Sequence, residues 1–481
     1  MCGRIVGLVV LGALLAAACG DDGGGVVGPV IPEMGTVRLT ASTTGSDLDR
    51  DGFQVRVDGT AAGELAPSGT LEIGDIEPGP HEVRLEDVAA NCLAAQNPRG
   101  VTATAGDTVV VAFEVSCEAL PWRVQDLGTL GWPGSQALQI NDRGQIVGDL
   151  MGGCGGSHSG ITPIPCASFL WEGGAMREVS PQLLGRELVP YAGVGRNLSE
   201  PGHVLVGGGI WWNGEAIELA PWWAVGINER GQVLCTGRLE SSPPDGPFYD
   251  EPGVWDNGSV RRLGVPEGYM GAEPRLIADD GDVFVAGQSG PDCESGYPFC
   301  GHHLWNDGSY HRIDSPHLLW VHAVDDGLVA GEISRDDRGI AVVWQAGVLT
   351  EIAEPQWTIS SAYWVANGRV AGRYTEEADG SSSSGTFIWH EGRMANVVPG
   401  LLATHLSADG TSLLGRIGIE YGWQAVVWRD GSTLFLPALY EDQDCESLWI
   451  NRRDQVVGRC AVVKYGPYTA VLWEKETPDP D

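Results

Sequence analysis

The chain has 481 residues, in which 64 Asp and Glu outnumber 29 Lys and Arg and give a formal net charge of −35. Phosphate binding requires clustered Lys and Arg, so this composition predicts a surface that repels nucleic acid and anionic lipid. The length predicts two or three domains, unless a single repeat architecture takes up most of the chain.

Residues 1–18 are typical of an export signal. Arg4 is followed by an apolar run from Ile5 to Ala18, which ends in small residues and is too short to cross a bilayer comfortably. We therefore expect the mature protein to begin near residue 19. Residues 19–34, rich in Gly and Asp, are expected to form a flexible tether.

The end of this signal resembles the lipobox of bacterial lipoproteins. The segment from Leu15 to Gly20 carries the resemblance, and it implies that Cys19 becomes the acylated first residue. The sequence departs from the family at Ala16, where Leu is preferred, and an ordinary signal peptidase site near Ala18 is the alternative. The resemblance implies an exported protein anchored to a bacterial membrane by its lipid alone, facing the periplasm or the cell surface.

Residues 35–118 are expected to form a small antiparallel β-sandwich. Apolar residues alternate with polar ones in several short runs, of which 109–115 is the clearest, and Asp58-Gly59 and Pro78-Gly79 are typical turns. The segment 76–83 resembles the turn and strand of surface domains called PEGA-like.

An acidic loop lies within this first domain. Asp47, Asp49 and Asp51 have the spacing with which calcium loops present oxygen ligands. No helices flank the loop, and the twelfth position, Asp58, fits better as a hairpin turn. We weigh a calcium site against a solvated loop before a strand, and otherwise expect no cofactor.

The rest of the chain, 119–475, repeats one unit. A Trp recurs at intervals of 39 to 50 residues, preceded by a turn and a short apolar run ending in Gly. The repeated Trp residues are Trp171, Trp211, Trp255, Trp305, Trp344, Trp389, Trp428 and Trp473. Each copy contains four short apolar runs bounded by turn residues, which predicts four antiparallel strands. Eight such units predict a β-propeller of about eight four-stranded blades, and the chain as a whole is all-β.

The repeated Trp is expected to fill the wedge between neighbouring blades, where a large flat side chain buries most area. The last copy ends at Trp473 with no apolar run after it, so it lacks an outer strand. The segment 122–128 is strand-like and precedes the first full copy. We predict that it supplies the missing strand and latches the ring, leaving 476–481 as an acidic tail.

Export places the cysteines in an oxidising compartment, where disulfides form. Spacing along the chain favours near neighbours. The expected pairs are Cys92 with Cys117, Cys154 with Cys166, Cys293 with Cys300, and Cys445 with Cys460. Cys235 is not part of any expected pair and is expected to be a buried thiol.

The segments Asp126–Gly131, Ala137–Gly148 and Ser168–Gly174 together resemble the extracellular repeat family named HAF. The first copy matches closely and later copies are degenerate, over roughly residues 122–474. The resemblance implies secreted or surface-attached bacterial propellers. It implies no catalytic residues, because none define that family.

These patterns favour a surface-displayed binding or scaffold protein, because function in such folds lies in loops and end faces. Further Trp residues lie beside the repeat positions, and they would suit a glycan, a peptide or a protein ligand. The candidates for ligand binding are Trp222, Trp223, Trp320, Trp364 and Trp449. Alternatively they only fill the narrow axis. We expect a monomer.

An enzyme is the other class of function, most plausibly a carbohydrate-active hydrolase or lyase. It would need paired carboxylates across a pocket. None of the 64 acidic residues is marked as such a pair, and no Gly-x-Ser-x-Gly element is present. No catalytic residue is therefore predicted.

Overall fold

The computed structural model describes residues 33–45, 47–49, 52–152, 164–179, 197–206, 209–239, 249–290, 293, 299–378, 380–419, 422–429, 431–440, 443–463 and 466–476. The expected export signal, Cys19, most of the tether, Asp51, Cys154 and the tail from 477 lie outside these residues. Strands are the only long regular elements in the described part of the chain. None of the described residues forms a helix long and apolar enough to span a membrane.

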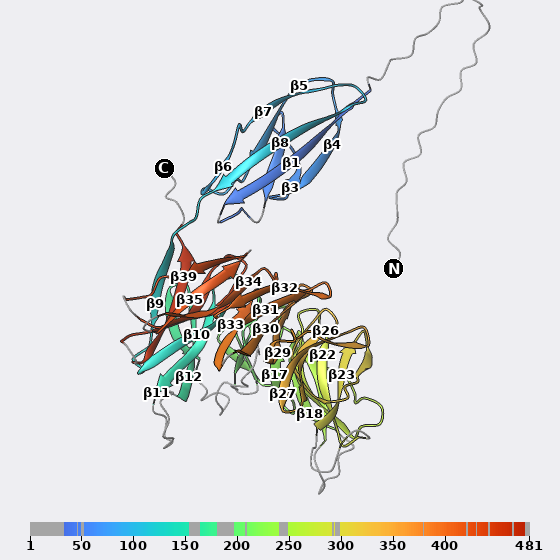
Figure 1. The fold of residues 1–481 in the computed structure, drawn as a ribbon, viewed down its shortest axis with the longest axis vertical. Helices are drawn as coiled ribbons and strands as arrows, with labels where there is room; N and C mark the ends of the chain where they lie inside the picture. The colour runs from blue at the N-terminus through green and yellow to red at the C-terminus, as the bar shows by residue number, and fades with distance from the viewer. Residues whose placement is uncertain are drawn as a thin grey trace, which may run out of the picture. The chain divides into compact units, whose positions relative to one another are not determined.

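The chain divides into two compact units, with the boundary between Leu120 and Pro121. The first unit is a sandwich of two four-stranded sheets, with strand orders β4-β1-β8-β6 and β3-β2-β5-β7 (Figure 1). Its strands are β1 (Gly35–Gly45), β2 (Phe53–Val57), β3 (Thr60–Leu65), β4 (Thr70–Ile76), β5 (Gly79–Glu86), β6 (Cys92–Ala94), β7 (Arg99–Ala103) and β8 (Thr108–Cys117). Alternate residues of β1, β2, β5 and β8 face one buried core, which includes Leu39, Phe53 and Phe113.

The expectation of a purely antiparallel sandwich is wrong at one place. β1 and β8 pair in parallel from Thr36 with Thr108 to Gly45 with Cys117. A parallel pair needs a long connection, and the six intervening strands provide it. The domain's first and last strands can therefore lie side by side in the same direction.

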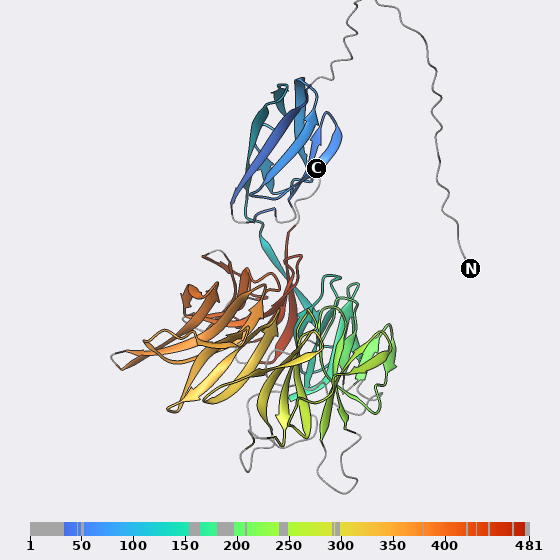
Figure 2. The same ribbon diagram turned by 90° about the vertical axis from the view of Figure 1, so that its right-hand side faces the viewer.

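The second unit, Pro121–Glu476, is a propeller of eight blades (Figure 2). Blades 1 to 4 comprise β10 (Gly134–Ile140), β11 (Ile146–Gly152), β12 (Ile164–Glu172) and β13 (Ala175–Val179); β14 (Val204–Val206), β15 (Gly209–Trp212) and β16 (Glu215–Ile217); β17 (Trp223–Ile227), β18 (Val233–Arg238), β19 (Asp250–Asp256) and β20 (Ser259–Arg262); and β21 (Gly271–Ile277), β22 (Val283–Gln288), β23 (Phe299–Asn306) and β24 (Ser309–Ile313).

Blades 5 to 8 continue around the ring. They comprise β25 (Leu318–Asp325), β26 (Leu328–Arg335), β27 (Arg338–Gln345) and β28 (Val348–Glu351); β29 (Trp357–Ala366), β30 (Arg369–Ala378), β31 (Ser381–His390) and β32 (Arg393–Pro399); β33 (Leu401–Leu406), β34 (Ser412–Ile419), β35 (Gly422–Arg429) and β36 (Ser432–Phe435); and β37 (Cys445–Ile450), β38 (Val456–Ala461), β39 (Tyr468–Lys475) and β9 (Trp122–Gly128).

The ring closes as predicted, because β9 is the outer strand of blade 8. β9 pairs antiparallel with β39, from Lys475 opposite Trp122 to Ala470 opposite Gly128. A buried cluster that includes Leu127, Ala137 and Leu472 joins blade 8 to blade 1. Similar clusters fill the other seven interfaces between neighbouring blades.

Seven of the repeated Trp residues lie in the third strand of their blade, and Trp211 lies in β15 of the three-stranded blade 2. All eight pack against the preceding blade. Trp344, for example, is 6% exposed and belongs to the cluster between blades 4 and 5. Trp473 is fully buried, and its indole N–H donates to the carbonyl of Pro437 at 2.8 Å. The role predicted for these residues, filling the wedge between blades, is confirmed.

The Gly in the second strand of most blades is required by a bulge in the inner strand. In seven described blades the pairing of the first two strands shifts register by one residue. A Cβ at Gly331 would overlap the carbonyl oxygen of Trp320, and one at Gly372 would overlap that of Ser361. Because backbone atoms cannot turn aside as a side chain can, larger residues would deform the inner strand.

Blade 2 departs from the expected four strands. Among the described residues its sheet has three strands, and a single bridge between Leu198 and Val204 occupies the place of the inner strand. The side chain of Gln139, from the inner strand of blade 1, accepts a hydrogen bond from the backbone N–H of Leu198 at 2.9 Å. This donor therefore bonds to the neighbouring blade.

Three of the four expected cysteine pairs are disulfides. Cys92–Cys117 joins β6 to β8, and Cys445–Cys460 joins directly opposed residues of β37 and β38. Cys293–Cys300 is the third. The fourth pair includes Cys154, which lies outside the described residues, so it stays a prediction.

Cys235 is a buried thiol outside any disulfide, as expected. Its position in β18 places it in the core between blades 2 and 3. Burial raises the pKa of this thiol to about 12, so it stays protonated at neutral pH.

Candidate binding cavity

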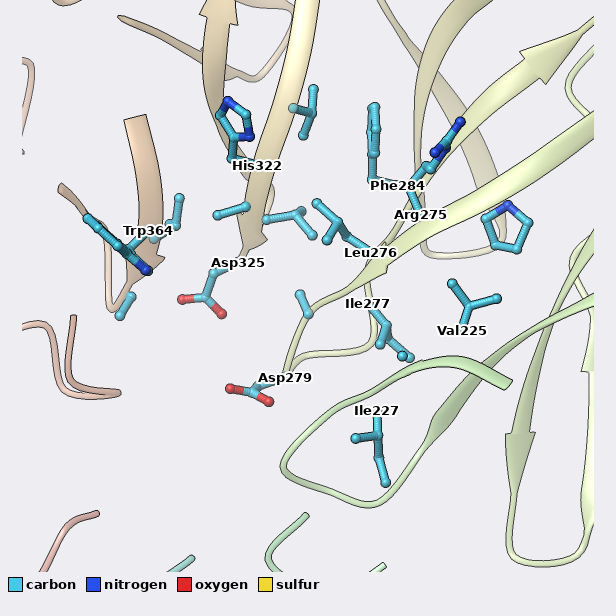
Figure 3. Close-up of a pocket in the computed structure, with 18 of the residues that line it drawn as sticks. Val225, Ile227, Arg275, Leu276, Ile277, Asp279, Phe284, His322, Asp325 and Trp364 are labelled. Atoms are coloured by element: carbon cyan, nitrogen blue, oxygen red, sulfur yellow. The ribbon is translucent and has the colours of Figure 1, made fainter. Parts of the chain in front are cut away.

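A cavity of about 1200 Å³ lies along the propeller axis, lined mainly by the inner strands of blades 3 to 8. These strands are β17, β21, β25, β29, β33 and β37. Because inner strands face the axis rather than another sheet, side chains from blades far apart in sequence meet there (Figure 3). We call the end of the cavity beside the turns that follow these strands the turn end.

Two Trp side chains are exposed on the cavity wall. Trp223, the first residue of β17, is 48% exposed, and Trp320 near the start of β25 is 43% exposed. Trp364 and Trp449 lie near the turn end and are more covered. The ring of Trp449 stacks on that of His405 with a centroid distance of 3.7 Å. Four of the five Trp residues predicted for ligand binding are therefore brought together.

Trp222, the fifth, is not in the cavity wall. Its indole fills the space beside Gly237 and Gly253, where a side chain would clash with it. The guanidinium of Arg262 lies 5.5 Å from the centre of its ring. Adjacent residues of an extended chain point to opposite sides, so Trp223 faces the axis while Trp222 packs in the blade.

The cavity is acidic. Among the described residues that line it, seven carry carboxylates and two carry guanidinium groups. The guanidinium of Arg275 forms an ion pair with Glu273 within the wall. The other, Arg452, lies at the turn end.

Asp325, at the end of β25, is the most strongly perturbed of these acids. Burial raises the pKa of its carboxyl group to about 6, and the backbone N–H of Asn367, which donates to it at 3.1 Å, opposes the rise. The negative charges of Asp279, Asp280 and Asp326 raise the pKa further. Asp325 is therefore a carboxyl group that changes charge close to neutral pH.

Two histidines in the cavity wall stay neutral at neutral pH. Burial lowers the pKa of His302 to about 4 and also lowers that of His322. The Nε2 atom of His322 is buried and has no hydrogen-bond partner among the described residues. Its ring packs on that of Tyr363, with centroids 4.9 Å apart.

The turns at the turn end are bonded to one another from blade to blade. The side-chain amide of Asn451 donates to the carbonyl of Asn141 at 2.9 Å. In the same way Asn141 donates to Ser199 and Asn228 donates to Ala278, each at 3.0 Å. These asparagines occupy equivalent positions in the repeats, so the same type of hydrogen bond, from a side-chain amide to a backbone carbonyl, recurs between the turns of these blades.

The residue after each of these asparagines extends the ring. The backbone N–H of Arg452 donates to Asp142 at 2.8 Å, and that of Glu229 donates to Asp279 at 2.7 Å. The guanidinium of Arg452 also forms ion pairs with Asp142 at 3.1 Å and with Glu229 at 2.6 Å. Arg452 thus joins blade 8 to blades 1 and 3 at the turn end.

Sequence analysis missed Asp279, Asp325 and Arg452 as candidate site residues. The available signal was their position in the repeat, since all three lie at or beside the turn after an inner strand. Aligning the copies would have shown that acidic residues recur at these turns. It would not have shown which of them face a cavity.

The acidic loop of the first domain is tied to the backbone. Asp47 accepts from the N–H of Leu120 at 2.8 Å, and Asp49 accepts from that of Ala89 at 2.7 Å. Asp51 lies outside the described residues. Within the part of the chain that the structure describes, no three His, Cys, Asp or Glu residues are grouped so as to hold a metal ion.

No protein-family model matches the sequence, and no curated protein matches it. Among solved structures, the chain is similar to the β-propeller domain of the Trilobed protease from Pyrococcus furiosus. The identity is 10% and the TM-score 0.39, over 72% of this chain and 100% of that chain.

Two further similarities are to enzymes. An acylaminoacyl peptidase from Pyrococcus horikoshii matches at 10% identity and a TM-score of 0.39, over 74% of this chain and 54% of that chain. A gluconolactonase from Xanthomonas campestris matches at 9% identity and a TM-score of 0.28, over 74% and 90%. The match thus spans about half the length of the peptidase. At these identities the likeness concerns the fold and says nothing about activity.

Proposed function

We propose that this protein is a surface-displayed binding propeller that holds its ligand in the axial cavity. The supporting observation is the exposure of Trp223 and Trp320 on the wall of that cavity. Large aromatic side chains that serve only as core are covered, as Trp344 is at 6% exposure. Exposed indole faces in a concave site are typical of surfaces that bind glycans or peptides.

Replacing Trp223 and Trp320 together with Ala is expected to weaken ligand binding by at least about tenfold, because the two changes together remove about 1.4 kcal/mol or more of apolar contact. Glycan and peptide libraries screened with the full chain provide the ligand. The melting temperature of the double variant should stay close to that of the wild type, since both side chains are partly exposed. If no library member binds in a way that depends on these two residues, the cavity is not the binding site.

A carbohydrate-active hydrolase or lyase is the second candidate. The observation that favours it is the carboxyl of Asp325, which titrates near neutral pH as a general acid does, and which lies close to Asp279. The same library screen, run with detection of product, separates the two functions. Turnover that Asp325→Asn abolishes would favour the enzyme.

Display at the surface is proposed to depend on acylation of Cys19. The lipobox-like sequence before Cys19 and the likeness to extracellular HAF repeats support this. We expect the wild-type protein to partition into detergent and its N-terminal peptide to carry the mass of acyl chains. A Cys19→Ala protein should be released into the aqueous phase, and its retention in the membrane would contradict the proposal.

A further inference from the structure

The charge of the axial cavity narrows the class of ligand. Its seven carboxylates and two guanidinium groups, counted over the described lining residues, leave an excess of negative charge. The whole chain carries a formal charge of −35, which adds a long-range attraction for cations. An anionic ligand would have to enter against both fields.

Asp279 and Asp325 point into the same part of the cavity, near the turn end (Figure 3). They come from neighbouring blades, one just after β21 and the other at the end of β25. The negative charge of Asp279 raises the free energy of ionising Asp325, because like charges repel in a partly buried site. A positive charge placed near both would relieve this repulsion.

The chain already holds a cation between carboxylates at the turn end. Arg452 inserts its guanidinium between Asp142 and Glu229 at the turn end, with nitrogen–oxygen distances of 3.1 and 2.6 Å. Its side chain is 60% exposed, so solvent screens these ion pairs and a competing cation can displace them at little cost. The geometry of the turns thus accommodates a guanidinium or ammonium group.

The aromatic wall suits the same ligand. The face of an indole attracts cations, and it also covers the methylene groups that separate them. Trp320, which is 43% exposed, lies in the cavity wall on the same strand as Asp325, five residues earlier. One residue of this stretch lies in the bulge of β25, so at roughly 3.3 Å per residue the wall between Trp320 and Asp325 is about 13 Å long. A ligand spanning it would be elongated.

We propose that the axial cavity binds an elongated organic cation, with an ammonium or guanidinium group between Asp279 and Asp325 and its aliphatic part against Trp320. This inference rests on the proposed function. The positive group belongs either to a free polyamine or to a Lys or Arg side chain of a peptide. The recognising chemistry is the same for both.

Spermine and a tetralysine peptide are the probes, and isothermal titration calorimetry with the full chain measures their affinity. Asp325→Asn and Asp279→Asn are each expected to weaken binding by at least about tenfold, because a hydrogen bond to a charged group in such a site contributes roughly 1.5 kcal/mol or more. Asp314→Asn is the matched control. It removes the same charge from a carboxylate that is 79% exposed and outside the cavity, and it should change the affinity little.

The affinity should also depend on pH. Burial raises the pKa of Asp325 to about 6, so this carboxyl loses its charge as the pH falls through that value. Asp279 and Asp280, after β21, and Asp326, beside Asp325, supply the charges that face it, with the N–H of Asn367 as donor. Because a bound cation favours the ionised form, binding releases protons and should be tighter at pH 7.5 than at pH 5. Asp325→Asn should remove the part of this dependence near pH 6.

The outcomes are distinct. Binding of spermine alone identifies a free polyamine as the source of the cation, and binding of tetralysine alone identifies a peptide. If neither binds, or if Asp325→Asn, Asp279→Asn and Asp314→Asn all weaken binding equally, the inference is overturned. A neutral oligosaccharide that binds through Trp223 and Trp320 without responding to Asp325→Asn also overturns it, while the proposed function then stands.

Discussion

Deleting residues 119–130 is expected to destabilise the whole propeller, although no complete blade is lost. The deletion removes β9, so β39 loses its antiparallel partner and the buried side chain of Leu127 is lost from the joint between blades 8 and 1. Removing one buried Leu side chain alone costs about 2–5 kcal/mol. At about 2–4 °C per kcal/mol for domains of a few hundred residues, the melting temperature should fall by roughly 10 °C.

The exposed edge of β39 should also promote association, because an unpaired strand edge is a template for another chain. Thermal melting followed by circular dichroism, together with light scattering, measures both effects. Leu127→Asp in the full-length chain is a gentler test of the same joint. Gln125→Thr, on the exposed side of β9, is its control and should melt like the wild type. A deletion variant that melts normally and stays monomeric would mean that β9 does not close the ring.

Trp344→Ala is expected to lower the free energy of unfolding by about 3–5 kcal/mol, as large-to-small changes of buried aromatic residues do. Trp344 is 6% exposed and packs among side chains of blades 4 and 5, so its removal leaves a cavity at the interface. Denaturant unfolding followed by fluorescence provides the measurement.

Trp223→Ala is the matched control for Trp344→Ala. It removes the same side chain from a position that is 48% exposed, so the unfolding free energy should change by about 0.5 kcal/mol or less. Its effect should appear in ligand binding instead. If Trp344→Ala left stability intact and abolished binding, the assignment of the repeated Trp residues to the blade interfaces would be wrong.

The number of blades could be predicted from the sequence because two positions of the repeat are constrained by backbone geometry. The Trp must fill the wedge between sheets, and the Gly must clear the bulged carbonyl, as at Gly331 and Gly372. Such constraints survive in degenerate copies. The closure of the ring by β9 could be predicted in the same way. The eighth copy of the repeat lacks an outer strand, so another segment of the chain must supply it.

Other features could not be predicted, because they depend on contacts between segments that share no local pattern. The parallel pairing of β1 with β8 joins the two ends of the first domain. Whether Trp222 or Trp223 faces the axis depends on the register of β17 against β18. Asp279 and Asp325 are ordinary turn acids in sequence, and only the ring places them together.

The pairing of β9 with β39 also determines how the propeller can fold. Thr469 of β39 donates a hydrogen bond to Asp126 of β9 across 343 positions of sequence. Within a blade, by contrast, strands pair with near neighbours and can form as soon as they are synthesised. Closure must offset the entropy of a very long loop and cannot begin until the last strand exists. We therefore expect blades to assemble early and ring closure to be the slow step, with an open ring as the intermediate that is most exposed to aggregation.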